Sequence, residues 1–234
     1  MIGLSALVSL TLLGCDQKQG NATAEPPAQS PAASESAART QSAKLGVDKP
    51  GATAKLGEKA PGFVLKDLSG SDVRLSDFEG KVVVLEWFNP ECPFVKASHE
   101  KGSLKGLAAK HHEKDDVVWL AINSGGEGRQ GYGVEKNRAA VNKYSLPHPV
   151  LLDETGSVGR AYGATNTPHM FIVDKQGRLA YKGAIDNSPD GEGEAAPDGN
   201  LVNYVTQALS ELARGKPVST PETKAYGCSV KYST

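Results

Sequence analysis

The chain has 234 residues with 38 % hydrophobic side chains, a size and composition typical of one or two globular domains. Its 26 basic and 27 acidic side chains nearly balance, which excludes a general electrostatic hold on nucleic acid. No apolar run of the sequence approaches the ~20 residues of a transmembrane helix, and three cysteines are too few for a disulfide-stapled scaffold of this size.

Residues 1–15 form an apolar segment, MIGLSALVSLTLLGC, and the charged residues begin directly after Cys15. An apolar run of this length is typical of a signal peptide. Leu12-Leu13-Gly14-Cys15 resembles the lipobox of bacterial lipoproteins, which implies that Cys15 is acylated. The alternatives are a cleaved secretory signal, giving a soluble secreted form, and a buried N-terminal helix. We therefore expect an extracytoplasmic, periplasmic-side protein that is attached to a bacterial membrane through Cys15 only.

Residues 16–54 are dominated by Ala, Ser, Pro and Gln and contain no aromatic side chain. Such a segment cannot bury enough apolar area to offset the entropy of ordering it. We predict a disordered linker of about 40 residues, which as a flexible coil has an end-to-end distance of roughly 35 Å.

Residues 55–218 contain the apolar runs that are typical of a folded domain. A hairpin is predicted over 63–75, and the run KVVVLEWF at 81–88 predicts a central strand covered on both faces. A long helix is predicted from Pro93 to about Lys114. The later predictions are strands at 117–123, 149–153, 169–174 and 178–185, and helices at 134–144, 157–162 and 201–214. Alternating strands and helices, closed by strand-turn-strand-helix, indicate an α/β sheet with one antiparallel edge.

Cys92 lies where the buried strand ends and the long helix begins. The free N–H groups and the dipole of a helix N-terminus stabilise an anion, so a thiol at this place is expected to ionise more readily. The sequence therefore predicts a reactive cysteine. The alternative is a small buried residue that only packs at the strand end.

Three motifs in order carry a family resemblance: Glu86-Trp87-Phe88 ahead of Cys92-Pro93-Phe94-Val95, then Thr167-Pro168, then Gly227-Cys228-Ser229-Val230-Lys231-Tyr232. They resemble the thioredoxin-like superfamily, in particular the redoxin branch related to alkyl hydroperoxide reductase C and thiol-specific antioxidant proteins. The resemblance implies an α/β thioredoxin-like fold, with a central mixed sheet flanked by helices and an N-terminal hairpin extension. It also implies that Cys92 is the nucleophile, and that Pro93 and a cis-proline turn at Thr167-Pro168 contact the substrate.

Two departures from the related patterns bear on the chemistry. Val95 stands where thioredoxins have their second cysteine, so the usual short-loop disulfide cannot form. Leu85 and Asn89 stand where peroxiredoxins have a Pro and a Thr or Ser ahead of their reactive cysteine. The second departure counts against direct peroxide reduction.

Glu86 interrupts an apolar strand six residues before Cys92, where thioredoxins carry a buried acid. A carboxylate in such a strand is costly unless it is partnered or protonated, and burial raises the pKa of a carboxyl group. We expect Glu86 to accept and donate protons for the cysteine pair. The alternative is an edge carboxylate paired with Lys81 or Lys96.

Cys228 lies in a C-terminal tail, residues 219–234, where mobility is expected. If Cys15 carries lipid, Cys92 and Cys228 remain, and an extracytoplasmic location permits a disulfide between them. We expect Cys228 to resolve the oxidised or mixed-disulfide form of Cys92. The alternatives are a static structural disulfide and a lone thiol.

Two further patterns are weaker. Gly126 to Gly131 fits G-x-G-x-x-G, but it follows the second predicted strand of the domain, where a mobile charged loop is the simpler account. The loop from Asp186 begins like a calcium site but has Pro197 where a bidentate Glu is needed. We therefore expect neither a cofactor nor a metal ion.

The sequence as a whole predicts a thiol-disulfide oxidoreductase in which Cys92 attacks, Glu86 handles the proton and Cys228 resolves the intermediate. Its partners are then a disulfide or peroxide substrate and a thioredoxin-like reductant protein. One alternative function is a thiol peroxidase that reduces hydroperoxides. A second is a non-enzymatic redox-sensing or partner-binding module.

Overall fold

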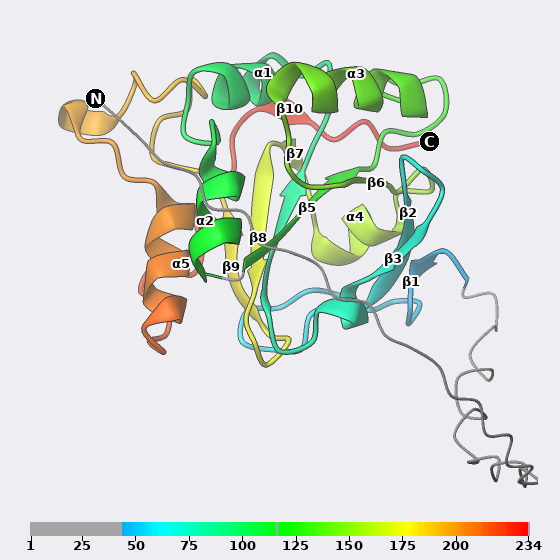
Figure 1. Ribbon diagram of the computed structural model, residues 1–234, viewed down its shortest axis with the longest axis horizontal. Coiled ribbons are helices and arrows are strands. Elements are labelled where there is room, and N and C mark those ends of the chain that lie inside the picture. The colour runs from blue at the N-terminus through cyan, green and yellow to red at the C-terminus, as the bar shows by residue number, and fades with distance from the viewer. Residues whose placement is uncertain (1–43, 116, 234) are drawn as a thin grey trace, which may run out of the picture. The chain divides into compact units, whose positions relative to one another are not determined.

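The computed structural model describes residues 44–115 and 117–233 (Figure 1). The predicted signal peptide with Cys15 and the predicted linker up to residue 43 lie outside the described residues. Within the described part, no helix is long and apolar enough to cross a membrane. The strand β1 (Gly46–Val47) already pairs with the next strand, so regular structure begins inside the range 16–54 that composition assigned to the linker.

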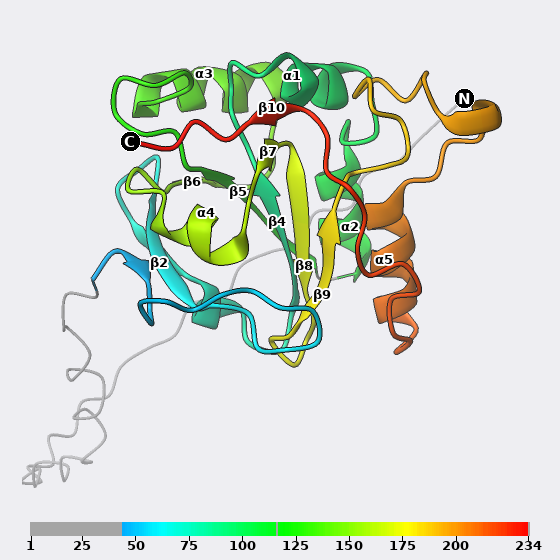
Figure 2. The same cartoon turned by 180° about the vertical axis from the view of Figure 1, so that it is seen from behind.

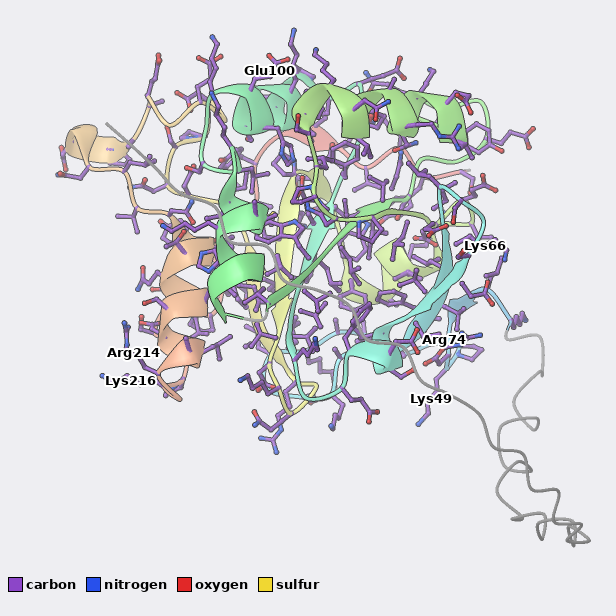
Figure 3. All side chains as sticks on the ribbon, viewed as in Figure 1. Lys49, Lys66, Arg74, Glu100, Arg214 and Lys216 are labelled. Atoms are coloured by element: carbon purple, nitrogen blue, oxygen red, sulfur yellow. The ribbon has the colours of Figure 1, made fainter. Side chains whose placement is uncertain are left out.

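A mixed β-sheet forms the centre of the described domain, with strand order β1-β2-β6-β5-β4-β8-β9 and with β3 on the outer side of β2. Its further strands are β2 (Phe63–Asp67), β3 (Asp72–Arg74), β4 (Val82–Trp87), β5 (Val117–Asn123), β6 (Val150–Leu152), β8 (His169–Val173) and β9 (Leu179–Gly183). β4, β5 and β6 are parallel, whereas β2, β8 and β9 join antiparallel. The β2–β3 hairpin, from which Lys66 and Arg74 point outward (Figure 3), is the predicted N-terminal extension.

Helices cover the sheet on both faces and at one end. They are α1 (Pro93–Glu100), α2 (Leu107–Asp115), α3 (Val134–Tyr144), α4 (Ser157–Tyr162) and α5 (Tyr204–Ala213), with short 3₁₀ turns at Leu75–Phe78 and Pro197–Gly199. α4 packs on one face, α2 and α5 pack on the other, and α1 and α3 lie together beyond the carboxyl end of β4 (Figures 1 and 2). The predicted thioredoxin-like arrangement is confirmed.

The alternation of side chains along β4 explains why this strand is covered on both sides. Leu85 and Trp87 join the apolar cluster that contains Tyr162 of α4, whereas Val82 and Val84 face the cluster formed with α2 and α5. Every residue of β4 is buried. Successive side chains of a strand point to opposite faces, so a continuous apolar run is what a doubly covered strand requires.

The single long helix predicted from Pro93 to about Lys114 is wrong. The chain leaves the helical conformation after Glu100 and forms a second helix, α2, that begins at Leu107. Gly106 has a φ of +68°, which a right-handed helix does not contain, and Gly102 lies so close to the carbonyl oxygen of Gly191 that a Cβ would overlap it. The break lets α1 lie with α3 beyond the carboxyl end of β4, while α2 packs against the face of the sheet that α5 also covers.

The C-terminal tail, which is described for residues 219–233, is docked on the domain. Its strand β10 (Cys228–Ser229) pairs antiparallel with β7 (Asn166–Thr167) in a small second sheet. Figure 2 shows the tail passing β7 beneath α1 and α3. The pairing places Cys228 beside Cys92, the residue that precedes α1.

Candidate active site

Cys92 is the N-cap residue of α1, after the short turn that follows the central strand, as the sequence predicts. Asn89 helps to form the connecting turn, because its backbone oxygen accepts a hydrogen bond from the Cys92 N–H at 3.1 Å. The Cys92 side chain is 0 % exposed. Its Sγ donates a hydrogen bond of 3.0 Å to the carbonyl oxygen of Thr167. The thiol is therefore enclosed and held against the turn that precedes β8.

This turn contains the cis peptide bond that the resemblance implies, between Thr167 and Pro168. Both residues are buried, whereas Pro93, the first residue of α1, is exposed. Thr167 is the last residue of β7, so its backbone serves two purposes at once. Its carbonyl group accepts from Cys92, and its strand pairs with the tail.

Cys228 sits directly opposite Thr167 in the β7–β10 register, which brings the tail cysteine to the Cys92 thiol. Burial and the neighbouring Cys92 sulfur raise the pKa of Cys228 to about 11, while Lys231 and the Phe94 N–H act in the opposite direction. Both cysteines are free thiols in this structure, and Cys228 is partly exposed. Two thiols 136 positions apart in the chain therefore meet at one turn, as 228 minus 92 gives.

Glu86 is the penultimate residue of β4 and is 0 % exposed. Its Oε1 is 2.7 Å from Nε2 of His99, and its Oε2 accepts a hydrogen bond of 3.0 Å from Nε1 of Trp119. Burial by itself raises the pKa of Glu86, but the attraction and hydrogen bond of His99, the nearby His148 and the Trp119 hydrogen bond outweigh it, so the pKa is lowered. The carboxylate is held in its charged form.

These contacts revise what the sequence suggests for Glu86. The carboxylate is not at an edge, and the side chain that it contacts at 2.7 Å is His99 of α1 rather than Lys81 or Lys96. His99 lies seven residues after Cys92 on the same helix, so the pair ties β4 to the helix that Cys92 begins. Proton exchange between Glu86 and the thiols stays a prediction, since both hydrogen bonds described above go to other groups.

A cavity of about 40 Å³ lies beside this pair and is lined in part by His99, Trp119, Tyr144 and His148. The His148 ring packs 5.9 Å from Trp119, and neither of its ring nitrogens has a hydrogen-bond partner among the described residues. Burial lowers the pKa of His148 to about 4, and the attraction of Glu86 recovers only part of the loss. The sequence does not single out His148 or Trp119, because the chain brings them to Glu86 from other elements.

The His148 shift predicts a pH dependence of stability. Between its ordinary pKa of 6.5 and the folded value of about 4, the unfolded chain binds a proton that the folded chain does not. The free energy of unfolding should therefore fall as the pH is lowered through this window, by up to about 3 kcal/mol from this residue. Urea unfolding at a series of pH values measures the slope.

His148→Phe is the informative variant, because it keeps a ring against Trp119 and removes the titration. Its unfolding free energy should depend less steeply on pH, with a residual slope from His169, whose pKa burial also lowers to about 4. Identical slopes in the two proteins would contradict the assignment.

The two weaker sequence patterns have structural explanations. The Gly126 N–H donates a hydrogen bond of 2.9 Å to the carbonyl oxygen of Lys231, so the glycine loop contacts the tail. The side chain of Asp190 accepts hydrogen bonds from Ser188 and from backbone N–H groups of its own loop. Within residues 44–115 and 117–233, no cluster of three or more His, Cys, Asp or Glu side chains could hold a metal ion.

A larger cavity lies away from the cysteines. It has a volume of about 600 Å³ and is lined by residues at the start of β4 and in the β8–β9 turn, including Lys81, Val83 and Gln176. Cys92 follows the opposite, carboxyl end of β4. The candidate active site is at Cys92 and Cys228, because the two thiols lie together there. The larger cavity is at the other end of β4.

The fold and the site define a thioredoxin-like protein whose helix-capping cysteine faces a cis-proline turn. Residues 55–198 match the Redoxin family, and the chain belongs to this family. The match covers the helix-capping cysteine and the cis-proline turn but ends before the tail with Cys228.

Curated relatives of the chain are named thiol-disulfide oxidoreductase ResA. One from Geobacillus thermodenitrificans is 32 % identical over 124 residues, which cover 53 % of this chain and 66 % of the relative. One from Bacillus thuringiensis is 29 % identical over 132 residues, covering 53 % and 67 %. The match thus spans about two thirds of the length of these relatives.

Two crystal structures resemble the described domain over more of its length. A hypothetical protein, SMc02350 from Sinorhizobium meliloti, has a TM-score of 0.67 at 28 % identity and covers 82 % of this chain and 100 % of its own. An uncharacterized conserved protein from Geobacillus kaustophilus has a TM-score of 0.65 at 32 % identity, with 76 % and 93 % covered. Both support the fold.

Proposed function

We propose that the protein is a thiol-disulfide oxidoreductase whose redox-active pair is Cys92 and Cys228. The observation that carries the proposal is the meeting of both thiols at Thr167, one through a 3.0 Å hydrogen bond and the other through strand register. The names of the ResA relatives support the same chemistry.

The proposed reaction needs both thiols. The Cys92 thiolate attacks one sulfur of a substrate disulfide, forms a mixed disulfide and releases the first product as a thiolate. Cys228 then loses its proton and attacks the Cys92 sulfur, which releases the second product thiol and leaves a Cys92–Cys228 disulfide. A dithiol reductant, which we propose is a thioredoxin-like protein, then reduces the Cys92–Cys228 disulfide to two thiols. The reductant itself is oxidised to a disulfide.

A thiol peroxidase is the second candidate, because a cysteine at a helix N-terminus also suits attack on a peroxide oxygen. The positions of Leu85 and Asn89 in the sequence count against it, as does the absence of peroxide chemistry from the names of the relatives cited above. The non-enzymatic alternative is a redox-sensing module. Such a module would be oxidised by a substrate but would not turn over catalytically.

Stopped-flow mixing of the reduced protein with a model disulfide or with hydrogen peroxide separates these candidates. We expect rapid oxidation by the disulfide and slow oxidation by peroxide, followed by mass spectrometry that shows the Cys92–Cys228 cross-link within one chain. Faster reaction with peroxide supports the peroxidase. Stoichiometric oxidation without catalytic turnover supports the sensor.

We also propose an extracytoplasmic location with a lipid anchor at Cys15, on the evidence of the apolar residues 1–15 and the lipobox resemblance. Cys15→Ser should move the protein from the membrane fraction to the soluble or unprocessed fraction, because acyl chains are then lost. Cell fractionation measures this, and the reactivity of Cys92 serves as the internal control. A correctly processed Cys15→Ser protein that still sediments with membranes would show that the anchor lies elsewhere.

A further inference from the structure

The tail pairs with the edge of β7 as an added antiparallel strand. Cys228 pairs with Thr167 and Ser229 with Asn166, and the Val230 N–H donates a hydrogen bond of 3.0 Å to the Thr165 carbonyl oxygen. Asn166 also donates from its side-chain Nδ2 to the Gly227 carbonyl oxygen at 3.1 Å. A partner segment that sought to pair with this edge would first have to displace the tail.

Anchors on both sides of Cys228 hold the tail in place. Before it, the Tyr226 hydroxyl donates a hydrogen bond of 2.8 Å to Oδ1 of the buried Asp186. After it, the Tyr232 hydroxyl donates to the Ala164 carbonyl oxygen at 2.7 Å, and the Arg160 guanidinium lies 4.7 Å from the Tyr232 ring centre. Cys228 is thus fixed from two directions.

Glycines allow the tail and the domain surface to approach each other closely. A Cβ at Gly227 would overlap the Thr167 carbonyl oxygen, and Cβ atoms at Gly126 and Gly159 would overlap Ser233 and the Tyr232 hydroxyl. The absence of a side chain at each of these positions is what permits the close approach. The surface of the domain is therefore shaped to its own tail.

The docked tail leaves the two cysteine residues unequally exposed. Cys92 is 0 % exposed beneath the β7 turn and the tail, whereas Cys228 is partly exposed. We infer that an external thiol reductant attacks the sulfur of Cys228 and that Cys92 is the buried leaving group. The inference rests on the proposed function and assigns the point of contact for its reductant.

The step is a simple exchange. A thiolate of the dithiol reductant bonds to the Cys228 sulfur, the Cys92–Cys228 bond breaks, and Cys92 leaves as a thiolate that takes up a proton. The second thiolate of the reductant then attacks its own sulfur in the mixed disulfide and releases Cys228, so the two electrons pass from the reductant to the pair. The tail can stay docked throughout, whereas attack by Cys92 on a bulky substrate requires the tail to leave the β7 edge.

Reduced glutathione is a suitable probe. The oxidised protein is mixed with glutathione, quenched with acid at short times, blocked with N-ethylmaleimide and peptide-mapped by mass spectrometry. Glutathione should be found at least about tenfold more often on Cys228 than on Cys92, because exchange depends on access to the attacked sulfur. A majority on Cys92 overturns the inference and leaves the proposed function intact. A map without a Cys92–Cys228 cross-link before glutathione is added overturns the proposed function itself, and the inference with it.

A pair of variants tests whether the docked tail is the cause. Tyr232→Ala removes the ring from Arg160 and the hydrogen bond to Ala164, so the preference for Cys228 should fall several-fold as Cys92 becomes accessible. Lys224→Ala changes an exposed residue of the same tail and should keep the wild-type ratio. An unchanged ratio in a folded Tyr232→Ala protein overturns the role given to the tail.

Discussion

We expect the Cys92→Ser and Cys228→Ser proteins each to reduce a model disulfide at the background rate, a loss of turnover on the order of 10³-fold or more. The physical reason is that the cycle needs two thiols, so removing either one stops it after at most one exchange. The double variant should be no worse than either single variant, because residues that act as a unit do not contribute additively.

Steady-state reduction with a dithiol reductant in excess measures this effect. Cys15→Ser is the matched control, since it removes a cysteine that has no place in the proposed chemistry and should keep wild-type turnover. A Cys228→Ser protein that turns over at more than about a tenth of the wild-type rate would mean that another group resolves the intermediate.

The second large effect is on stability. Glu86→Leu leaves His99 and the Trp119 N–H without their buried partner, and breaking a buried pair in this way typically costs about 3–5 kcal/mol. Glu86→Gln keeps the shape and can still accept from Trp119, so its cost should be smaller. Urea unfolding at neutral pH measures both variants.

Glu58→Leu is the control for the loss of an acidic side chain. Glu58 is 61 % exposed and lies 3.7 Å from Lys55, so its removal should change the free energy of unfolding by less than about 1 kcal/mol. The pH dependence gives a second check. Because the folded-state pKa of Glu86 is lowered below 4.5, its contribution is present above that pH and is lost as the pH falls through the lowered value. Equal costs for Glu86→Leu and Glu58→Leu would refute the importance of the buried pair.

Local patterns in the sequence predict much of the fold. The apolar run of β5 and the helices α3 and α4 lie at the predicted residues, because burial on both faces and helical periodicity are visible over short windows. The α1–α2 break is harder to predict in this way. Gly102 and Gly106 are local signals, but isolated glycines are tolerated in helices, and the close approach of Gly102 to Gly191 involves a distant loop.

The site is predicted in part, for a related reason. Cys92 follows from its place between a strand and a helix. The two-residue strands β7 and β10 have no local pattern, and they exist because residues 61 positions apart pair with each other, as Thr167 does with Cys228. The contact between Glu86 and His99 is not predicted from the sequence either, because Glu86 lies on a strand and His99 on a helix.

The separation of the two thiols along the chain links the redox state of the pair to the integrity of the whole domain. Cys92 follows the central strand and Cys228 lies in the tail after α5, so a disulfide between them closes a loop of 136 residues (228 minus 92). In the chain-entropy treatment such a cross-link destabilises the unfolded ensemble by about 5 kcal/mol. Each turn of the proposed cycle therefore alternates a more heat-resistant oxidised form with a less resistant reduced form.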